Sequence, residues 1–250
     1  MTVPWEGDQA GLGLQGDLAA AVDQLYLAFS GCPKPSRIDG CPHWMRSDAD
    51  QALLGVPLRE LEHAALGRYV FSAMLTWGTS ADFRYFTPRI LEQAAAGQWV
   101  YSDLEIAFGR LGAADWRQWP SEEATAVERV LELLWRDTLS SWPGPYGADP
   151  VLCALGNAVD DLGAFLDCWV AVIDSEAGAR HLRQFIAVNI PSFYPGRRLA
   201  NAFWPGRGSQ AAQVAGWLMS PRLKDAVTEA YLRAATPAAA HALAEADQYL

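Results

Sequence analysis

The chain has 250 residues, of which 51% are hydrophobic and 19% are charged, and its formal net charge is −10. This composition can bury a sizeable core in one large domain or two small ones, which excludes global disorder. The acidic balance disfavours nonspecific binding to nucleic acid or to an anionic membrane, because both require a basic face. It permits a basic protein partner or a cationic ligand.

Four short polar residues are followed directly by proline, and each pair predicts the start of a helix: Thr87-Pro88, Asp149-Pro150, Ser220-Pro221 and Thr236-Pro237. The polar side chain can accept an unpaired backbone N–H, and proline at the first helical position loses no hydrogen bond. Together with apolar residues at the helical period, these signals predict helices at 17–29, 47–54, 57–77, 80–86, 87–97, 150–173, 175–190, 209–219, 221–234 and 237–250, and a long helix that starts at Ser121.

Further signals refine this outline. Gly78 is a candidate end for the helix over 57–77, and Ser102 with Glu105 is typical of a capping box. Residues 98–101 are a weak strand candidate, while alternating strand patterns with hairpin turns are missing from the sequence. We therefore predict an all-α fold of about ten short capped helices, in an irregular bundle or a HEAT-like stack. The lack of a fixed repeat period favours the irregular bundle.

The domain organisation and compartment follow from the same survey. Residues 1–16 are predicted to form an irregular arm, and residues 17–250 one helical domain with a subdivision near 142–149, in a Pro/Gly-rich stretch. No run reaches the ~18 apolar residues of a membrane span, and the first sixteen residues lack a signal-peptide pattern. We expect a cytoplasmic protein with reduced cysteines and no membrane partner.

A Pro- and Gly-rich loop carries Cys32, Cys41 and His43. Thiolates and imidazole are zinc ligands, but the spacing lacks the paired C-x2-C geometry and a fourth ligand. The alternative is an ordered loop whose cysteines pack or stay free, and it is the interpretation we favour. No cofactor is expected, and zinc at this loop is the minority hypothesis.

Aromatic and charged side chains alternate between Trp77 and Glu92. Arginine stacks on rings and binds carboxylates with two hydrogen bonds, so such a stretch can build a ligand pocket. The alternative, which we favour, is a packed helix–turn–helix corner with an Arg89–Glu92 ion pair. The candidate ligand-binding residues are Trp77, Asp82, Arg84, Tyr85, Arg89 and Glu92, joined by Arg110 and Trp116.

The run W-G-x-x-x-D-F-R-Y-F-x-P-R-I-L-E, carried by Trp77 to Glu92, resembles the signature of a family of bacterial all-helical proteins with no assigned activity. The cysteine loop and the stretches 109–116 and 216–222 fit the same pattern, so the resemblance spans most of residues 20–233. Members of that family carry a further cysteine close behind the position of Cys41, where this chain has His43 and Trp44. The resemblance implies a helical fold and no particular activity.

Two other charged groups are candidates. Arg197, Arg198 and Arg207 lie between two aromatic-Pro-Gly turns and could bind an anion or the acidic face of a second subunit, although solvated arginines in a structured loop are the simpler explanation. The acidic residues Asp160 and Asp161 fall on the solvent side of the helix predicted over 150–173, which argues against a metal–diphosphate site there.

No catalytic or nucleotide-binding fingerprint emerges from the sequence. We predict a non-enzymatic, protein-binding helical module, such as an antitoxin-like or scaffold protein that engages a basic partner. The eleven tryptophans support this, because their N–H groups favour grooves and interfaces. The alternative is an enzyme or small-ligand protein with a pocket around Trp77–Glu92. No nucleic-acid partner is expected, and a homo-oligomer is compatible with the sequence.

Overall fold

The computed structural model describes residues 16–40, 47–99, 103–193 and 198–250. This part of the chain is helical and contains no β-strand, so the predicted all-α fold is confirmed. Three 3₁₀ turns accompany the helices: η1 (Phe29–Gly31), η2 (Leu58–Glu60) and η3 (Trp116–Gln118). The α-helices are α1 (Gly16–Ala28), α2 (Ser47–Leu54), α3 (His63–Ser72), α4 (Ser80–Ala95), α5 (Leu104–Ala113), α6 (Ser121–Ser140), α7 (Ala148–Ala158), α8 (Gly163–Val172), α9 (Glu176–Phe193), α10 (Gly208–Leu218), α11 (Pro221–Arg233) and α12 (Pro237–Asp247).

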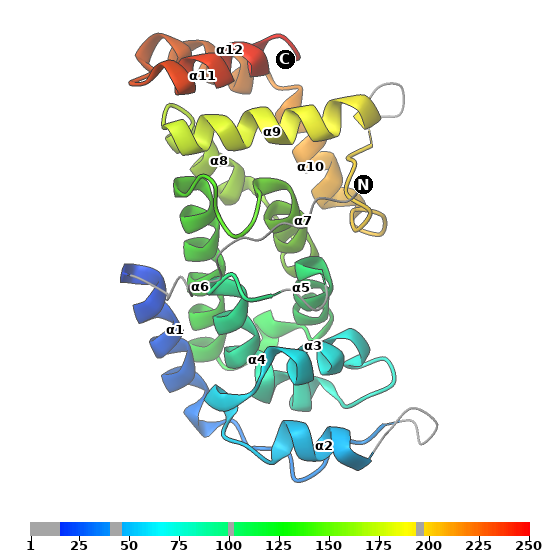
Figure 1. Ribbon diagram of the computed structural model, residues 1–250. Helices are drawn as coiled ribbons and strands as arrows, with labels where there is room; N and C mark the ends of the chain where they lie inside the picture. Colours follow the sequence, from blue (N-terminus) through cyan, green and yellow to red (C-terminus); the bar gives the residue numbers. More distant parts are fainter. Residues whose placement is uncertain (1–15, 41–46, 100–102, 194–197) are drawn as a thin grey trace, which may run out of the picture.

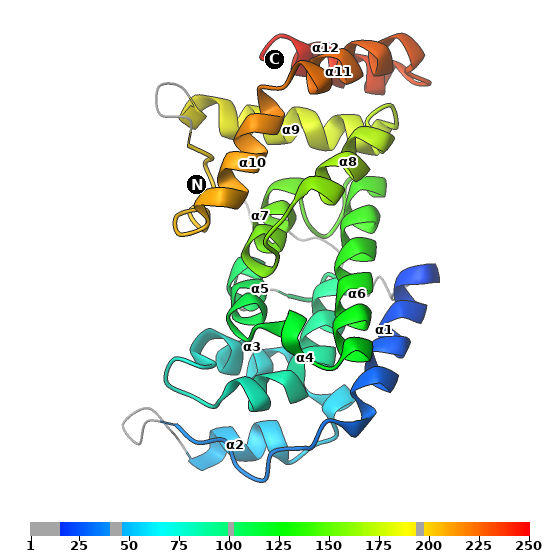
Figure 2. The same cartoon turned by 180° about the vertical axis from the view of Figure 1, so that it is seen from behind.

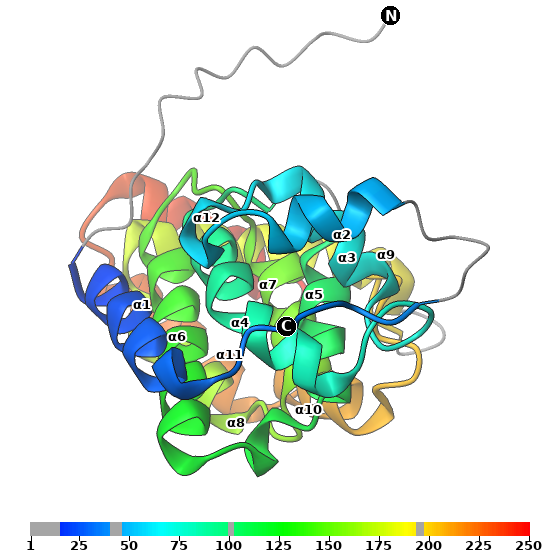
Figure 3. The same ribbon diagram turned by 90° about the horizontal axis from the view of Figure 1, so that it is seen from below.

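The helices form an elongated, irregular bundle, with α2 and α3 at one end and α11 and α12 at the other (Figures 1 and 2). Helix α1 packs along α6, α5 packs along α7, and α9 packs along α12. In the view along the long axis, α1 and α6 lie together on one side and α10 on the other (Figure 3). No helix in the described ranges is both long and apolar enough to cross a membrane.

The centre of the bundle is aromatic. Trp135 of α6 and Trp169 of α8 are fully buried and meet edge to face, with ring centroids 5.3 Å apart. Their indole N–H groups donate to the carbonyl oxygens of Phe165 and Gly178. Burying the rings while satisfying their polar edges ties α6, α8 and α9 together.

Two of the four predicted cap–proline pairs are confirmed. Ser220 accepts the N–H of Leu223 at the start of α11, and Thr236 accepts the N–H of Ala239 at the start of α12, with proline at the first helical position in both. Each cap satisfies one of the backbone donors that a helix start leaves without an intrahelical acceptor.

The predicted helix start at Thr87-Pro88 is wrong. Helix α4 starts at Ser80, as predicted, and runs without interruption through Pro88; its cap is Thr79, which forms a capping box with Asp82. Thr87 is buried, and its hydroxyl donates to the carbonyl oxygen of Phe83 within the helix. Burial of one face of α4 outweighs the hydrogen bond that Pro88 removes.

The predicted start at Asp149-Pro150 is also wrong, because α7 begins at Ala148, two residues before Pro150, and Asp149 does not cap it. The predicted helix over 150–173 is in fact two helices, α7 and α8, separated by residues 159–162. Asp161 accepts the N–H of Gly163 at the start of α8. Asp160 and Asp161 therefore belong to a connection and not to a helix face, and both are exposed.

The helix predicted over 57–77 is shorter than expected. It consists of η2 and α3, and α3 ends at Ser72. Three consecutive backbone N–H groups, those of residues 75–77, then donate to the Ser72 carbonyl oxygen, and Met74 adopts a positive φ of 61°. Gly78 does not end this helix: with φ at 75°, a Cβ there would lie 2.9 Å from Ile38 Cγ2, so glycine permits a close approach of two loops.

Two remaining predictions involve residues outside the described ranges. Ser102 of the expected capping box lies outside the described residues, and Glu105 is buried and accepts a hydrogen bond from Asn201. Of the weak strand candidate at 98–101, residues 98 and 99 are not in a strand, and the remainder lies outside the described residues.

Candidate functional site

The aromatic side chains of the Trp77–Glu92 stretch form a packed corner. Phe86 is fully buried and Trp77 is partly buried, and both rings contact the buried ring of Tyr69 at centroid distances of 4.8 and 5.4 Å. Tyr85 is partly buried and meets Phe86 edge to face. The ring contacts therefore belong to the core between α3 and α4.

The charged groups of the same stretch bind within the chain. Asp82 caps its own helix through Thr79. Arg84 binds both carboxylate oxygens of Glu123 on α6, at 2.5 and 2.6 Å, and Glu123 is 4% exposed. This bidentate pair joins α4 to the first turn of α6.

Arg89 forms the predicted ion pair with Glu92 at 2.6 Å and also donates to the Leu61 carbonyl oxygen. Glu92 in turn accepts the hydroxyl of Tyr26 at 2.6 Å, which joins α4 to α1. Burial and this bond to a carboxylate raise the pKa of Tyr26 well above its ordinary value. All three charged or polar groups thus have partners inside the fold.

Arg110 and Trp116 are likewise engaged. The Arg110 guanidinium donates to the carbonyl oxygens of Val70 and Phe71, two acceptors at the C-terminal end of α3. Trp116 is 2% exposed, and its indole N–H donates to the Ala158 carbonyl oxygen at 2.8 Å. The structure places the charged candidates in contacts within the chain, while Trp116 lies apart from the Trp77–Glu92 corner, against the end of α7.

Of the zinc candidates, Cys41 and His43 lie outside the described residues. Cys32 is partly buried after η1, and burial is the main cause that raises the pKa of its thiol. Among the described residues, no three His, Cys, Asp or Glu side chains gather closely enough to hold a metal ion. Cys153 is buried in the core and Cys168 partly buried.

Of the arginine candidates, Arg197 lies outside the described residues. Arg198 is exposed, and Arg207 donates from Nε to the Asn157 side-chain oxygen at 3.1 Å. Arg207 therefore fixes its segment to α7, whereas Arg198 forms no ion pair with another described residue.

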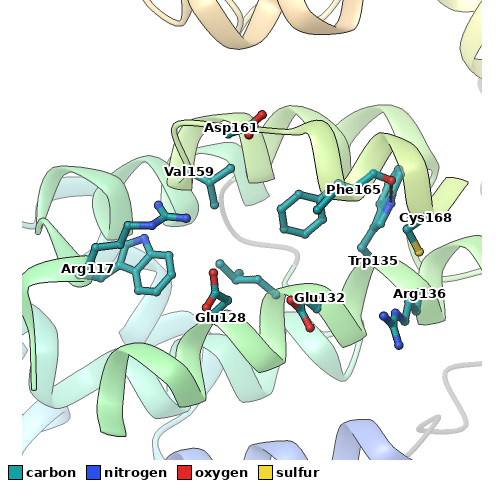
Figure 4. Close-up of a pocket in the computed structure, with 12 residues that line it drawn as sticks. Arg117, Glu128, Glu132, Trp135, Arg136, Val159, Asp161, Phe165 and Cys168 are labelled. Carbon is teal, nitrogen blue, oxygen red and sulfur yellow. Dashed lines mark hydrogen bonds between the residues drawn. The ribbon is translucent and has the colours of Figure 1, made fainter. Parts of the chain in front are cut away.

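An open groove lies between α6, α8 and the turn η3, with a volume of about 270 Å³. Figure 4 shows Arg117 at one end, Cys168 and Arg136 at the other, and Glu128 and Glu132 on the α6 side between them. The floor is apolar, and its side chains come from η3, α6, α8 and the connection at 159–162: Trp116, Leu131, Trp135, Val159, Ala164 and Phe165.

The rigidity of the floor comes from the core beneath it. Trp135 is fully buried and donates to the carbonyl oxygen of Phe165, so the two walls of the groove are joined at 2.8 Å. Arg117 lies over the ring of Trp116, with its guanidinium carbon 4.5 Å from the ring centroid. The groove is therefore a formed feature of the fold.

The charges along the rim differ in kind from those of the Trp77–Glu92 corner. Glu128, Arg117 and Arg136 form no ion pair with another described residue, and Glu132 has one weak pair, to Arg129 at 3.6 Å. Glu128 and both arginines are exposed. Glu128 and Arg136 can exchange water for a ligand at small cost, because neither has an ion pair with a described residue that would have to break.

Sequence reasoning missed this groove. The sequence predicted the helix that forms the α6 wall of the groove. It also predicted one continuous helix over 150–173, whereas the chain breaks at 159–162, and this break sets the direction of α8. The signal available was Gly163 two residues after Asp161, a pair typical of a turn before a helix start.

No protein-family model, curated protein or solved structure matches this chain. The resemblance carried by the Trp77–Glu92 signature stays a prediction.

Proposed function

We propose that the protein is a non-enzymatic helical binding module and that the groove between α6 and α8 receives a basic segment of a protein partner. The observation that carries the proposal is the arrangement of charge over an apolar floor, where among the four rim groups only Glu132 has an ion-pair partner in the described part of the chain, Arg129 at 3.6 Å. Glu128 and Glu132 lie in the middle of the groove, and Arg117 and Arg136 lie at its ends (Figure 4).

This arrangement favours a segment with a cationic residue at its centre. An arginine or lysine there would place its charge against Glu128 and Glu132 and its aliphatic stem over Leu131 and Phe165. Arg117 and Arg136 at the ends favour acidic or neutral flanking residues, since a fully basic segment would be repelled there. The net charge of −10 adds a long-range attraction that speeds encounter with a basic protein.

The small volume of the groove indicates an anchor site and not the whole interface. About 270 Å³ holds one or two side chains, whereas stable protein interfaces bury on the order of 1,600 Å². One anchored side chain in a desolvated slot, surrounded by weaker contacts, is the usual distribution of energy at such interfaces.

Fluorescence polarisation with labelled helical peptides tests the proposal. The first peptide carries a central arginine on a leucine face, and the second replaces that arginine with glutamate. We expect the first to bind and the second to bind at least tenfold more weakly. The double substitution Glu128→Arg and Glu132→Arg should reverse the preference, because it replaces the two carboxylates opposite the central arginine with two cations that repel it.

Asp225→Arg is the matched control, because Asp225 is exposed on α11, does not line the groove, and has no ion pair with another described residue. It changes the net charge by the same amount as each groove substitution. If Asp225→Arg weakens binding of the arginine peptide as much as the groove substitutions do, net charge and not the groove selects the peptide, and the proposal is overturned. Equal binding of both peptides to the wild-type protein would also overturn it.

A further inference from the structure

A second cavity, of about 460 Å³, lies on another part of the surface, between residues 198–205 and α10. One wall is the face of α10 formed by small residues at helical spacing: Gly208, Ala211, Ala212 and Ala215. Leu199 and Trp204 form the other wall, and both are at least nine-tenths buried. The cavity exists because nothing larger than a methyl group projects from this face of α10.

The walls are fixed by the fold. Trp204 packs its ring edge so closely on α7 that a Cβ at Gly156 would lie 2.6 Å from it. The backbone N–H of Ala200 donates to the Asn189 side chain at 2.8 Å, and Asn201 binds Glu105 and Asp149. The segment that carries Leu199 and Trp204 is therefore held against three helices, and the cavity needs no rearrangement to form.

The polar groups at the cavity are donors and cations. Arg198 stands on its rim, exposed and without an ion-pair partner among the described residues. Gly208 opens α10, and no side chain caps this helix start, so its first N–H groups are left for an external acceptor.

From this combination we propose that the cavity binds an amphipathic monocarboxylate, with its apolar chain between Trp204 and the small-residue face of α10 and its carboxylate at Arg198 and the start of α10. Apolar walls with a single cationic edge suit one anion on a hydrocarbon body. The volume fits a medium-chain fatty acid, since ligand pockets of about 300–1,000 Å³ enclose molecules of this size. This site is separate from the groove between α6 and α8, so either proposal can fail without the other.

Isothermal titration with dodecanoate below its micellar concentration tests the proposal, and dodecyltrimethylammonium serves as the probe of opposite charge. We expect saturable one-to-one binding of dodecanoate and none of the cation. Arg198→Gln should weaken binding about tenfold, while Arg68→Gln, at an exposed arginine of α3, should leave it unchanged.

Ala212→Leu fills the cavity from an exposed position of α10 that favours leucine in a helix, so the variant should fold normally. We expect it to abolish dodecanoate binding. Equal binding of both amphiphiles, or unchanged dodecanoate binding by Ala212→Leu with normal circular dichroism, would overturn the proposal.

Discussion

Replacing Asn201 with alanine should destabilise the fold more than its partly exposed position suggests. The two hydrogens of its side-chain amide are donated to two carboxylates, Glu105 at 2.7 Å and Asp149 at 3.1 Å, and its oxygen accepts the N–H of Phe203 at 3.0 Å. Glu105 is 5% exposed. The substitution removes the donor that accommodates a buried negative charge.

The expected cost follows from these contacts. A hydrogen bond to a charged group contributes about 1.5–3 kcal/mol, and the two bonds share one amide, so we expect a loss of about 3 kcal/mol at neutral pH. For a protein of this size each kcal/mol corresponds to about 2–4 °C in Tm, which gives a decrease of about 6–12 °C.

The loss of stability caused by Asn201→Ala should become larger as the pH rises. Burial raises the pKa of Glu105, and the bond from Asn201 opposes that rise. A carboxyl whose folded pKa is raised contributes stability that is present below its unfolded pKa and lost as pH rises through the folded value. Without Asn201 the folded pKa of Glu105 rises further, so the gap between variant and wild type should be largest near pH 7 and shrink toward pH 4.

Urea unfolding at pH 4, 5, 6 and 7 measures the loss of stability caused by Asn201→Ala. The control is the same substitution made in a protein that also carries Glu105→Gln. Glutamine keeps the oxygen that accepts from Asn201 and removes the charge, so Asn201→Ala should cost less in that background, and Glu105→Gln alone should stabilise the protein at pH 7. A loss that is the same at every pH and in both backgrounds would refute the reasoning, because the charge of Glu105 would then play no part.

Three further predictions concern packing, pairing and titration. Gly112→Ala should lower the free energy of unfolding in urea by about 1–3 kcal/mol, because the added Cβ would lie 2.4 Å from a main-chain oxygen of α7. Gly109→Ala is its control and should be neutral or stabilising, because the nearest atom to its Cβ is 3.8 Å away. Arg84→Ala should cost about 2–4 kcal/mol by leaving the Glu123 carboxylate buried without its partner, and Arg84→Lys should recover part of it in the same assay. Burial lowers the pKa of His181 in the folded protein, so its contribution to stability is present above about pH 6.5 and is lost as the pH falls through that folded-state pKa. His181→Gln should therefore reduce the slope of Tm against pH in this range.

The sequence predicted the helical content well because capping and periodicity are local. Ser220 and Thr236 begin helices where expected, since each needs only its own next three residues to make the cap. Thr87 and Asp149 failed for one common reason, which is that a tertiary partner outweighs the local signal. Thr87 is buried in the face of α4, and Asp149 receives hydrogen bonds from Asn189 and Asn201.

The candidate sites were harder to predict than the helices. The run Trp77–Glu92 attracted attention because charged and aromatic residues alternate along it, yet an alternating run cannot reveal that Glu123 lies opposite Arg84, or Tyr26 opposite Glu92. Those partners are 39 and 66 residues away. Both cavities lie between elements whose crossing depends on short connections, at 159–162 and 198–207, for which the helical period gives no information.

What separates a binding surface from a structural contact here is whether its charged groups have partners in the chain. Arg84 gains two short bonds to a buried carboxylate, so a ligand that recruited it would have to break that pair and leave Glu123 uncompensated, at a cost comparable to the whole affinity of a weak complex. Glu128 and Arg198 have no such internal contact among the described residues, and each stands beside an apolar surface. A ligand that meets either group gains an ion pair without disrupting the fold. The groove and the α10 cavity are therefore better candidates for a binding site than the aromatic corner, although the corner has the more conspicuous sequence.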